Sequence, residues 1–516
     1  MMKPDHRAVS SEARDIKFPP KDAGQGISRF RVAAVLVFVI LNLAVFLLRA
    51  VSVWRYGGLF IGTGGDALVI YPVWKAIHHF PVYEWPLKYP FSLALYNYLF
   101  YYSYAFFLKL LGITGAGIMK AGSLCTPVFA LAGAWAQWRL VRGRLGLRGA
   151  GSILSLCFAV GLWVCTSLIR AWTFAIRPDM AAIALVMIAL WVVVRQPRFC
   201  FAYAGVLFYL AWAFKQSVVL ALAGVCLHLL FHKRWRDLSA LVAIFAVLAA
   251  ATLLLGTPEF RYSILVAPRV VKEFSVLHAL SIGARSAVAN GYWMLAPLVL
   301  LLAAGARRAD DAVHLLVTVF AVALLGGLAG MTKVGGADNY LFEAFVAGST
   351  LLQLAVFAAP GRCVNALLLY AWLLPAIQIA LRPAGALPHL CGTVGIATPA
   401  EYANAVALRD RLAVMKKPLF TTDMVLSLPW FSNGGRYPAL AIDRNYHDAT
   451  RSICSNGCVE GMLQRGEIPT VLLKSDDTSY LQSLSPKYQK VGEAFYLDRP
   501  WSIYTLSPSR QAAIHP

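Results

Sequence analysis

Long apolar segments recur along residues 32–381, and this pattern limits the fold more than any other feature of the chain. A helix needs about 20 apolar residues to cross the hydrocarbon core of a bilayer. The clear candidates are 32–53, 116–138, 150–168, 180–194, 238–256, 288–304, 313–330, 342–359 and 364–381. Hydrophobic residues make up 59% of the chain and charged residues only 14%, which excludes an ordinary soluble enzyme. We therefore expect a polytopic α-helical membrane protein.

Two further apolar stretches, 90–111 and 200–231, are ambiguous, and the short basic loops resolve them. Cytoplasmic loops are enriched in Lys and Arg. The basic loops contain Arg139, Arg142, Arg144, Arg148, Arg195, Arg198, Lys233, Arg234, Arg236, Arg307, Arg308 and Arg362. All of them lie on one face only if 90–111 stays on the outer face and 200–231 crosses twice, turning at Lys215 and Gln216. This arrangement predicts about eleven spans, with the N-terminus inside and the C-terminus outside.

Composition divides the chain into three parts. Residues 1–28 are polar and charged, and we expect them to be disordered in the cytoplasm. Residues 29–381 form the predicted transmembrane domain, whose first outer loop covers 54–115. Residues 382–516 have a soluble composition and strand-like runs at 418–422, 439–443, 470–474, 494–498 and 502–506, with a helical stretch at 398–417. They predict a small extracytoplasmic α/β domain, in which Cys454 and Cys458 can form a disulfide.

Charged residues gather on the predicted outer face, where charge beside a membrane is costly and usually serves a purpose. In the first loop, Asp66 follows two glycines. The second loop, "LIRAWTFAIRPDM", contributes Arg177 and Asp179. The loop expected over 257–287 carries four further Lys and Arg residues, and "MTKVGGADNYLFEA" precedes a late span. An outward cavity with Arg and Lys suits a lipid-linked phosphate, because guanidinium and ammonium groups both pair with phosphate oxygens.

Several motifs carry a family resemblance. "GGDALVIYPVWKAI", "PVYEWPLKYPF" and "YNYLFYY" follow the first span, "AIRPDMAAIALVMIAL" follows the third, and "GVLFYLAWAFKQSVVLALAG" and "GGADNYLFEAFVAGS" come later. Their order over residues 30–380 resembles the GT-C superfamily of integral membrane glycosyltransferases, especially the bacterial branch of lipid A aminoarabinose transferases and protein O-mannosyltransferases. The resemblance implies transfer of a sugar from a polyprenyl-phosphate carrier to a lipid, glycan or protein acceptor, on the outer face of the bacterial inner membrane.

The resemblance also implies residue roles. In such enzymes an acid in the first outer loop acts as general base on the acceptor hydroxyl or orients it, and Asp66 matches that position; Asp179 matches a second acid. Arg177 and Lys215, together with Lys88, would stabilise the charge of the leaving lipid phosphate. The other candidate substrate-binding residues are Tyr89, Gln216, Asn339, Tyr340 and Glu343. The first loop has no DxD pair, unlike the metal-using oligosaccharyltransferases, so we expect neither a metal nor a cofactor.

Most of these residues have a structural alternative. Asp66 can cap a helix over 66–79. Arg177 and Asp179 can pair with each other across Pro178, and Lys215 can extend to the membrane interface. Asn339, Tyr340 and Glu343 can simply cap the next span. The tyrosines at positions 96, 98, 101, 102 and 104 read as an aromatic belt at the interface.

Other functions also use a basic cavity. A transporter or flippase of a lipid-linked sugar is one alternative, and a ligase or polymerase of surface polysaccharide is another. Transporters concentrate polar residues near the bilayer midplane. Here the charges cluster at one face, which favours an enzyme.

Overall fold

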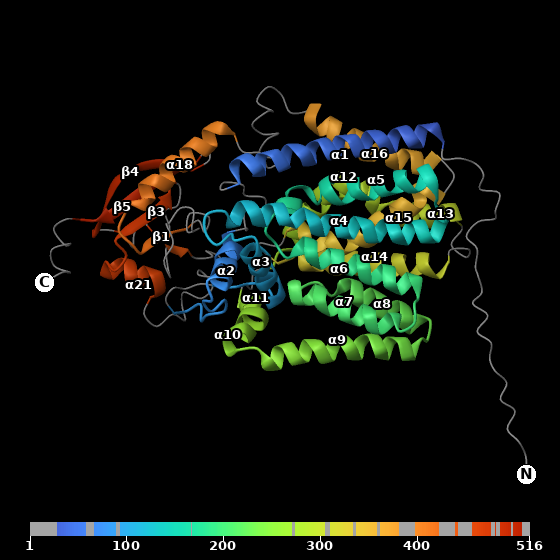
Figure 1. The fold of residues 1–516 in the computed structure, drawn as a ribbon, viewed down its shortest axis with the longest axis horizontal. Coiled ribbons are helices and arrows are strands. Elements are labelled where there is room, and N and C mark those ends of the chain that lie inside the picture. The colour runs from blue at the N-terminus through green and yellow to red at the C-terminus, as the bar shows by residue number, and fades with distance from the viewer. Residues whose placement is uncertain are drawn as a thin grey trace, which may run out of the picture.

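The computed structural model describes residues 28–57, 67–88, 93–166, 168–270, 274–304, 310–333, 337–358, 362–380, 398–422, 439–441, 457–475, Tyr480, Leu484, 486–496 and 499–507. Most of these residues belong to a bundle of helices that lie side by side (Figure 1). The helices of this bundle are α1 (Arg29–Tyr56), α4 (Ile118–Leu145), α5 (Gly149–Cys165), α6 (Asp179–Arg195), α7 (Cys200–Phe214), α8 (Leu220–Phe231), α9 (Trp235–Leu255), α12 (Val276–Met294), α13 (Ala296–Ala304), α14 (Asp311–Gly330), α15 (Phe342–Ala358) and α16 (Arg362–Ala380).

Six segments in the described part of the chain are long and apolar enough to cross a membrane. They are Arg29–Tyr56, Ile118–Leu145, Trp235–Leu255, Val276–Leu302, Asp311–Gly330 and Asp338–Ala358. Several shorter apolar helices lie beside them, so the protein is a multi-pass membrane protein, while the count of about eleven spans stays a prediction. Helix α15 forms the centre of the bundle, because every residue from Phe342 to Val356 is buried.

Further helices cover one end of the bundle, where α1 ends and the C-terminal domain begins, and α1 starts at the other end (Figure 1). They are α2 (Ala67–Ile77), α3 (Tyr98–Leu110), η1 (Arg170–Phe174), α10 (Pro258–Arg261), η2 (Tyr262–Val266), α11 (Ala267–Val270) and η3 (Asp338–Leu341). The ambiguous stretch 90–111 supplies α3, which packs beside α2. The stretch 200–231 is interrupted between Phe214 and Leu220, so the predicted break at Lys215 is present.

Two predictions need correction. The expected outer loop over 257–287 is wrong in its second half, because α12 already begins at Val276, where Ser275 accepts a hydrogen bond from the backbone N–H of His278. The aromatic belt is wrong for Tyr101 and Tyr104, which are buried, although Tyr102 is 49% exposed. The Tyr104 hydroxyl is hydrogen-bonded to Thr126 instead of facing lipid headgroups.

A five-stranded sheet forms the C-terminal domain, as predicted. Its strands are β1 (Leu419–Thr421), β2 (Ala439–Ala441), β3 (Thr470–Lys474), β4 (Tyr488–Tyr496) and β5 (Arg499–Leu506), in the order β2-β1-β3-β5-β4. β1 pairs in parallel with β2 and β3, whereas β5 runs antiparallel to β3 and β4. The accompanying helices are α18 (Pro399–Ala413) and α21 (Cys458–Arg465).

The C-terminal domain contacts the bundle at the end of α1, where the Tyr56 and Tyr402 rings lie 5.3 Å apart between centroids. Helix α18 begins with a capping box, in which the Thr398 side chain accepts from the Glu401 backbone N–H and the Glu401 carboxylate accepts from the Thr398 N–H. Cys458 is disulfide-bonded. Cys454, its predicted partner, lies outside the described residues.

Candidate active site at the start of helix α6

Three polar side chains from separate elements meet at the start of α6. Asp179 is the first residue of that helix, where a carboxylate interacts favourably with the helix dipole. Lys215 directly follows α7, and its Nζ lies 2.5 Å from Asp179 Oδ1. The Asn339 amide, from η3, donates to the same oxygen over 3.1 Å. Asp179 is 1% exposed and Lys215 is 9% exposed, so the ion pair is shielded from solvent.

A small cavity adjoins this ion pair. Its lining includes Asp179, Lys215, Asn339, Tyr340 and Glu343, and its volume of about 20 Å³ has room for about one water molecule. The second carboxylate oxygen of Asp179, Oδ2, is buried and has no hydrogen-bond partner among the described residues. An ammonium group has three N–H donors, so Lys215 can contact a ligand while it remains paired with Asp179. The cavity therefore offers both a free acceptor and a free cationic donor.

Glu343 connects this cavity to α8. Its Oε2 accepts a hydrogen bond from the Ala221 backbone N–H over 2.7 Å, which satisfies one of the open donors in the first turn of that helix. Tyr340 packs closely against α14, where Gly327 and Gly330 leave room for it. Glu343 thus positions the helix that follows Lys215, in addition to lining the cavity.

Arg177 and Gln216 hold the segment between α2 and α3 against the start of α6 and the end of α7. The Arg177 guanidinium donates to the Tyr96 hydroxyl over 2.7 Å and lies 5.1 Å from the centre of the Trp172 ring. The Gln216 amide donates to the Leu95 carbonyl over 2.7 Å. Two residues after Leu95, the Asn97 amide donates to the carbonyl of Trp212. Consequently, residues 95–97 are fixed beside the cavity.

The structure brings together five of the ten predicted site residues around one cavity: Asp179, Lys215, Asn339, Tyr340 and Glu343. Arg177 and Gln216 border it through residues 95–97. Lys88 is exposed and is not part of the cavity lining. Asp66 and Tyr89 lie outside the described residues, so the proposed role of Asp66 stays a prediction.

Two structural alternatives are wrong. Asp179 pairs with Lys215 and not with its sequence neighbour Arg177, because Lys215 reaches the carboxylate from the end of α7. Lys215 does not extend to the membrane interface, since it is buried in this ion pair.

Sequence reasoning missed a second buried ion pair, which joins α2 to the turn after it. Lys75 Nζ lies 3.0 Å from Glu84 Oε2, and the Lys75 side chain is fully buried. Burial lowers the pKa of Lys75, and the negative charge of Glu84 opposes that shift by raising it. Both charges are visible in the sequence, but no helical or strand spacing predicts a contact between residues nine apart across a turn. Tyr96 was also missed, because the run of tyrosines favoured an interfacial interpretation.

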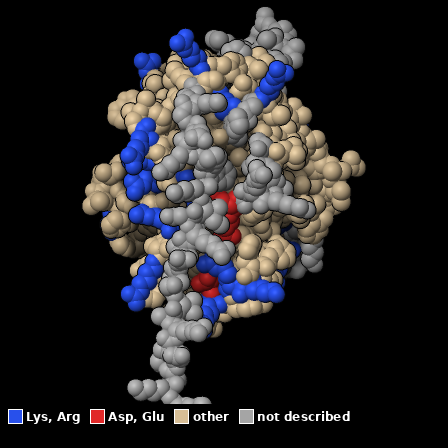
Figure 2. Space-filling model, turned by 90° about the vertical axis from the view of Figure 1, so that its right-hand side faces the viewer, with Lys and Arg blue, Asp and Glu red and all other residues tan. Residues whose placement is uncertain are grey.

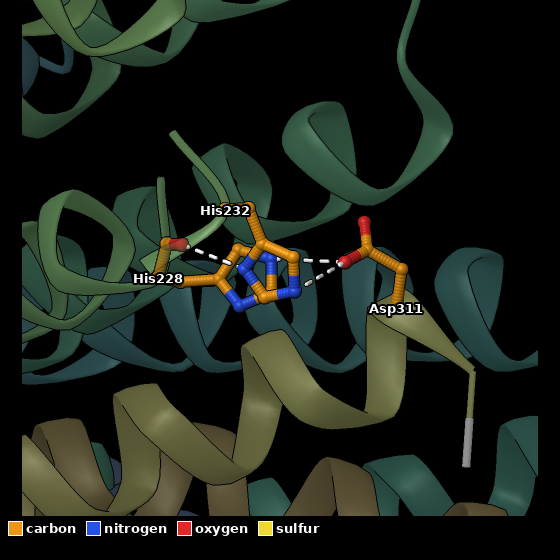
Figure 3. A group of neighbouring side chains, drawn as sticks. All are labelled: His228, His232 and Asp311. Carbon is orange, nitrogen blue, oxygen red and sulfur yellow. Dashed lines mark hydrogen bonds and ion pairs between the residues drawn. The ribbon is translucent and has the colours of Figure 1, made fainter. Parts of the chain in front are cut away.

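Among the described residues, one group of three side chains has the donor atoms and spacing of a metal site: His228, His232 and Asp311 (Figure 3). Asp311 Oδ1 lies 3.1 Å from His228 Nε2 and 3.7 Å from His232 Nε2. These residues lie at the end of α8 and the start of α14, and Asp311 is roughly 28 Å along α14 from the turn that contacts Tyr340. The group connects two helices far from Asp179 and is separate from the candidate active site.

No family model matches the chain, and no curated protein matches its sequence. Solved structures do resemble it. ArnT from Cupriavidus metallidurans bound to undecaprenyl phosphate aligns over 92% of this chain and 98% of its own, with a TM-score of 0.59 and 12% identity. The apo form of the same protein covers 91% of this chain and 97% of its own, with a TM-score of 0.60 and 15% identity.

A second group of similar structures comes from an archaeon. The oligosaccharyltransferase AglB from Archaeoglobus fulgidus, in complex with an inhibitory peptide and a dolichol-phosphate, aligns over 89% of this chain and 71% of its own. The TM-score is 0.51 and the identity 12%. At these identities the likeness establishes a shared fold. The chain thus shares the fold of the ArnT and AglB structures, in agreement with the resemblance carried by the order of its sequence motifs.

Proposed function

We propose that this protein is a membrane glycosyltransferase that moves a sugar from a polyprenyl-phosphate carrier to a lipid, glycan or protein acceptor. One observation carries the proposal: in a GT-C fold, a buried carboxylate at the start of α6 keeps one oxygen free beside a buried ammonium and a cavity. Ionisable groups held in this way beside a membrane cavity generally serve a function.

The donor half of the reaction needs positive charge. When the bond between the sugar's anomeric carbon and the phosphate oxygen breaks, the electron pair stays on the lipid phosphate. Lys215 is the described cation that lines the cavity, and Arg177 borders it, so both can stabilise this developing charge. The ArnT structure contains undecaprenyl phosphate and the AglB structure a dolichol-phosphate, which supports a lipid phosphate as the leaving group.

The acceptor half needs a base. The acceptor hydroxyl oxygen bonds to the anomeric carbon, and its proton passes to a carboxylate within hydrogen-bond reach. By the family resemblance we assign this role to Asp66. We assign Asp179 to holding the Lys215 ammonium through Oδ1 while Oδ2 accepts a hydrogen bond from a substrate hydroxyl. Asn339 fixes the orientation of the Asp179 carboxylate.

The proposed reaction is independent of metal ions and takes place on the outer face of the bacterial inner membrane. The active site and the C-terminal domain would then both be extracytoplasmic. Their location at the same end of the bundle, opposite the start of α1, supports this orientation (Figure 1).

A transfer assay with purified protein tests the proposal. Polyprenyl-phosphate carriers with radiolabelled sugars are supplied with membrane extract as the acceptor source, and the loss of label from the carrier is followed. We expect wild-type protein to consume the carrier, and the Asp66→Asn variant to be slower by at least about a hundredfold while it still binds the carrier.

A parallel assay in proteoliposomes distinguishes the transporter or flippase. If labelled carrier lipid crosses the bilayer and no sugar leaves the carrier, the transferase proposal fails and the transporter replaces it.

A further inference from the structure

A second pocket lies at the opposite end of the bundle from Asp179. The ends of α4 and α6 and the turn before α5 line a cavity of about 560 Å³, a size common among ligand sites. Five arginines contribute to its lining: Arg139, Arg142, Arg144, Arg148 and Arg195. We call this site the arginine pocket. Because Asp179 and Arg195 are the first and last residues of α6, the two sites are roughly 24 Å apart along that helix.

The positive charge of the arginine pocket is mostly unbalanced. Arg144 pairs with Asp310, but in the described part of the chain the other four arginines have no carboxylate partner. Figure 2 shows the end of the molecule at which these helices finish, and blue Lys and Arg side chains outnumber the small red areas there. Four guanidinium groups around one cavity repel each other, which a bound anion would relieve.

The residue type and its contacts point to phosphate. Every cation that lines the pocket is Arg and none is Lys, and the planar guanidinium matches phosphate through two parallel hydrogen bonds. The guanidinium carbons of Arg139 and Arg195 both lie 5.8 Å from the centre of the Trp191 ring. Contacts with a ring use no N–H donor, so the donors stay available while the side chains are held in place.

The surroundings favour a lipid as the source of that phosphate. Helix α4, which supplies three of the arginines, is a candidate membrane span, so the pocket lies where an apolar segment ends. Leu140, Leu147 and Val194 form its apolar wall, and Trp135, next to Arg139, is 44% exposed on the outside of the bundle. Exposed tryptophan and clustered arginine at the end of a span are typical of the lipid headgroup region.

We propose that the arginine pocket binds the headgroup of an anionic phospholipid and so joins the ends of α4, α5 and α6. Four unpaired arginines match two phosphates, with two guanidinium groups for each. The structure therefore favours a headgroup of the diphosphatidylglycerol kind. The proposal concerns the face opposite the candidate active site and does not depend on the transferase function.

The test compares two triple variants of the full chain in phosphatidylcholine nanodiscs. The pocket variant is Arg139→Gln/Arg148→Gln/Arg195→Gln. The matched control, Lys233→Gln/Arg236→Gln/Arg362→Gln, removes the same charge from exposed residues at the same end of the bundle but outside the pocket. Binding of diphosphatidylglycerol is measured by native mass spectrometry and by the shift in the unfolding midpoint. We expect the pocket variant to bind at least about tenfold more weakly than wild type, and the control to stay within about twofold.

Three results would overturn the proposal. If both triple variants lose affinity equally, the charge of the whole face and not the pocket attracts lipid. If wild type binds inorganic phosphate or ATP as tightly as the lipid, the ligand is a soluble phosphate. If diphosphatidylglycerol binds no better than phosphatidylcholine, the pocket has no such ligand. Arg148→Gln alone, which removes no ring contact or ion pair among the described residues, repeats the test if the triple variant does not fold, and we expect a smaller loss in the same direction.

Discussion

Asp179 and Lys215 are both buried, and they lie at the ends of different helices. The charge of each one is therefore neutralised by the other. Removing one member of a buried ion pair leaves an uncompensated charge, which costs about 3–5 kcal/mol, whereas replacing both members with neutral groups is often tolerated. Stability and chemistry can therefore be separated at this site by comparing single and double variants.

We predict that Asp179→Asn and Lys215→Gln each lower the unfolding midpoint of the purified protein, and that the double variant recovers most of the loss. The physical reason is that the double variant leaves no buried charge without a partner. Thermal unfolding of the four proteins in one detergent measures this. Additive losses in the double variant would contradict the pairing.

The sequence identified both residues as unusual, because each is a charge next to a long apolar segment. It could not predict that they pair. Asp179 and Lys215 are 36 positions apart, and their contact depends on how α6 and α7 approach each other. The nearer candidate, Arg177, instead donates to Tyr96, just before α3.

Helix α8 is a short helix that specific contacts hold in the bundle. It has 12 residues, about 18 Å, and is shorter than the hydrocarbon core of about 30 Å. It follows the break at Lys215, and Glu343 satisfies a backbone donor in its first turn. Gly224 lets it approach α14 closely, since a Cβ at that position would lie 2.6 Å from the Val319 Cα. Small residues at such contacts let membrane helices pack closely.

We predict that Gly224→Ala lowers the unfolding midpoint and slows transfer, because α8 must move away from α14 and its first turn adjoins the cavity. The matched control is Gly151→Ala in α5, where nothing lies within 4 Å of the added Cβ. We expect the control to be neutral or slightly stabilising, since Ala favours helix more than Gly. Equal effects at both positions would refute the close approach.

The sequence predicted many of the individual helices and strands. The five strand-like runs of the C-terminal region all form strands, because short apolar runs between turn residues carry a clear local signal. The start of α12 was missed, since His278, Ser281, Arg285 and Ser286 lower the hydropathy of its first turns. Hydropathy shows how long an apolar stretch is. It does not show that a helix begins several polar residues before that stretch.

The whole molecule has two distinct ends. The helices α2, α3, α10 and α11, the candidate active site and the C-terminal sheet occupy one, and the arginine pocket and the start of α1 occupy the other (Figures 1 and 2). Such a separation is what a protein fixed across a membrane requires, because each end then meets only one compartment.

We predict that a reporter fused after residue 145 is cytoplasmic and one fused after residue 400 is external. These positions follow α4 and the start of α18, which lie at opposite ends of the molecule. Alkaline phosphatase and fluorescent-protein fusions measure the two locations. Both reporters on the same side would contradict this topology.

We also predict that EDTA leaves the transfer rate unchanged. The Asp179 carboxylate already has an ammonium 2.5 Å away, so a metal ion there would face a like charge. The transfer assay is repeated with chelator and then with added Mn²⁺ or Mg²⁺. Loss of activity that these ions restore would contradict a metal-independent reaction.

The most direct measurement is the transfer rate of the double variant Asp179→Asn/Lys215→Gln beside a matched control, Arg234→Gln/Asp237→Asn. The control likewise neutralises one ion pair, a partly exposed one in the first turn of α9 and away from the cavity. Label released from a radiolabelled polyprenyl-phosphate sugar is followed for both proteins and wild type. We predict that the site variant remains folded and loses at least about a hundredfold in rate, while the control keeps the wild-type rate. Full transfer by a folded site variant would show that the Asp179–Lys215 pair is structural and that the active centre lies elsewhere.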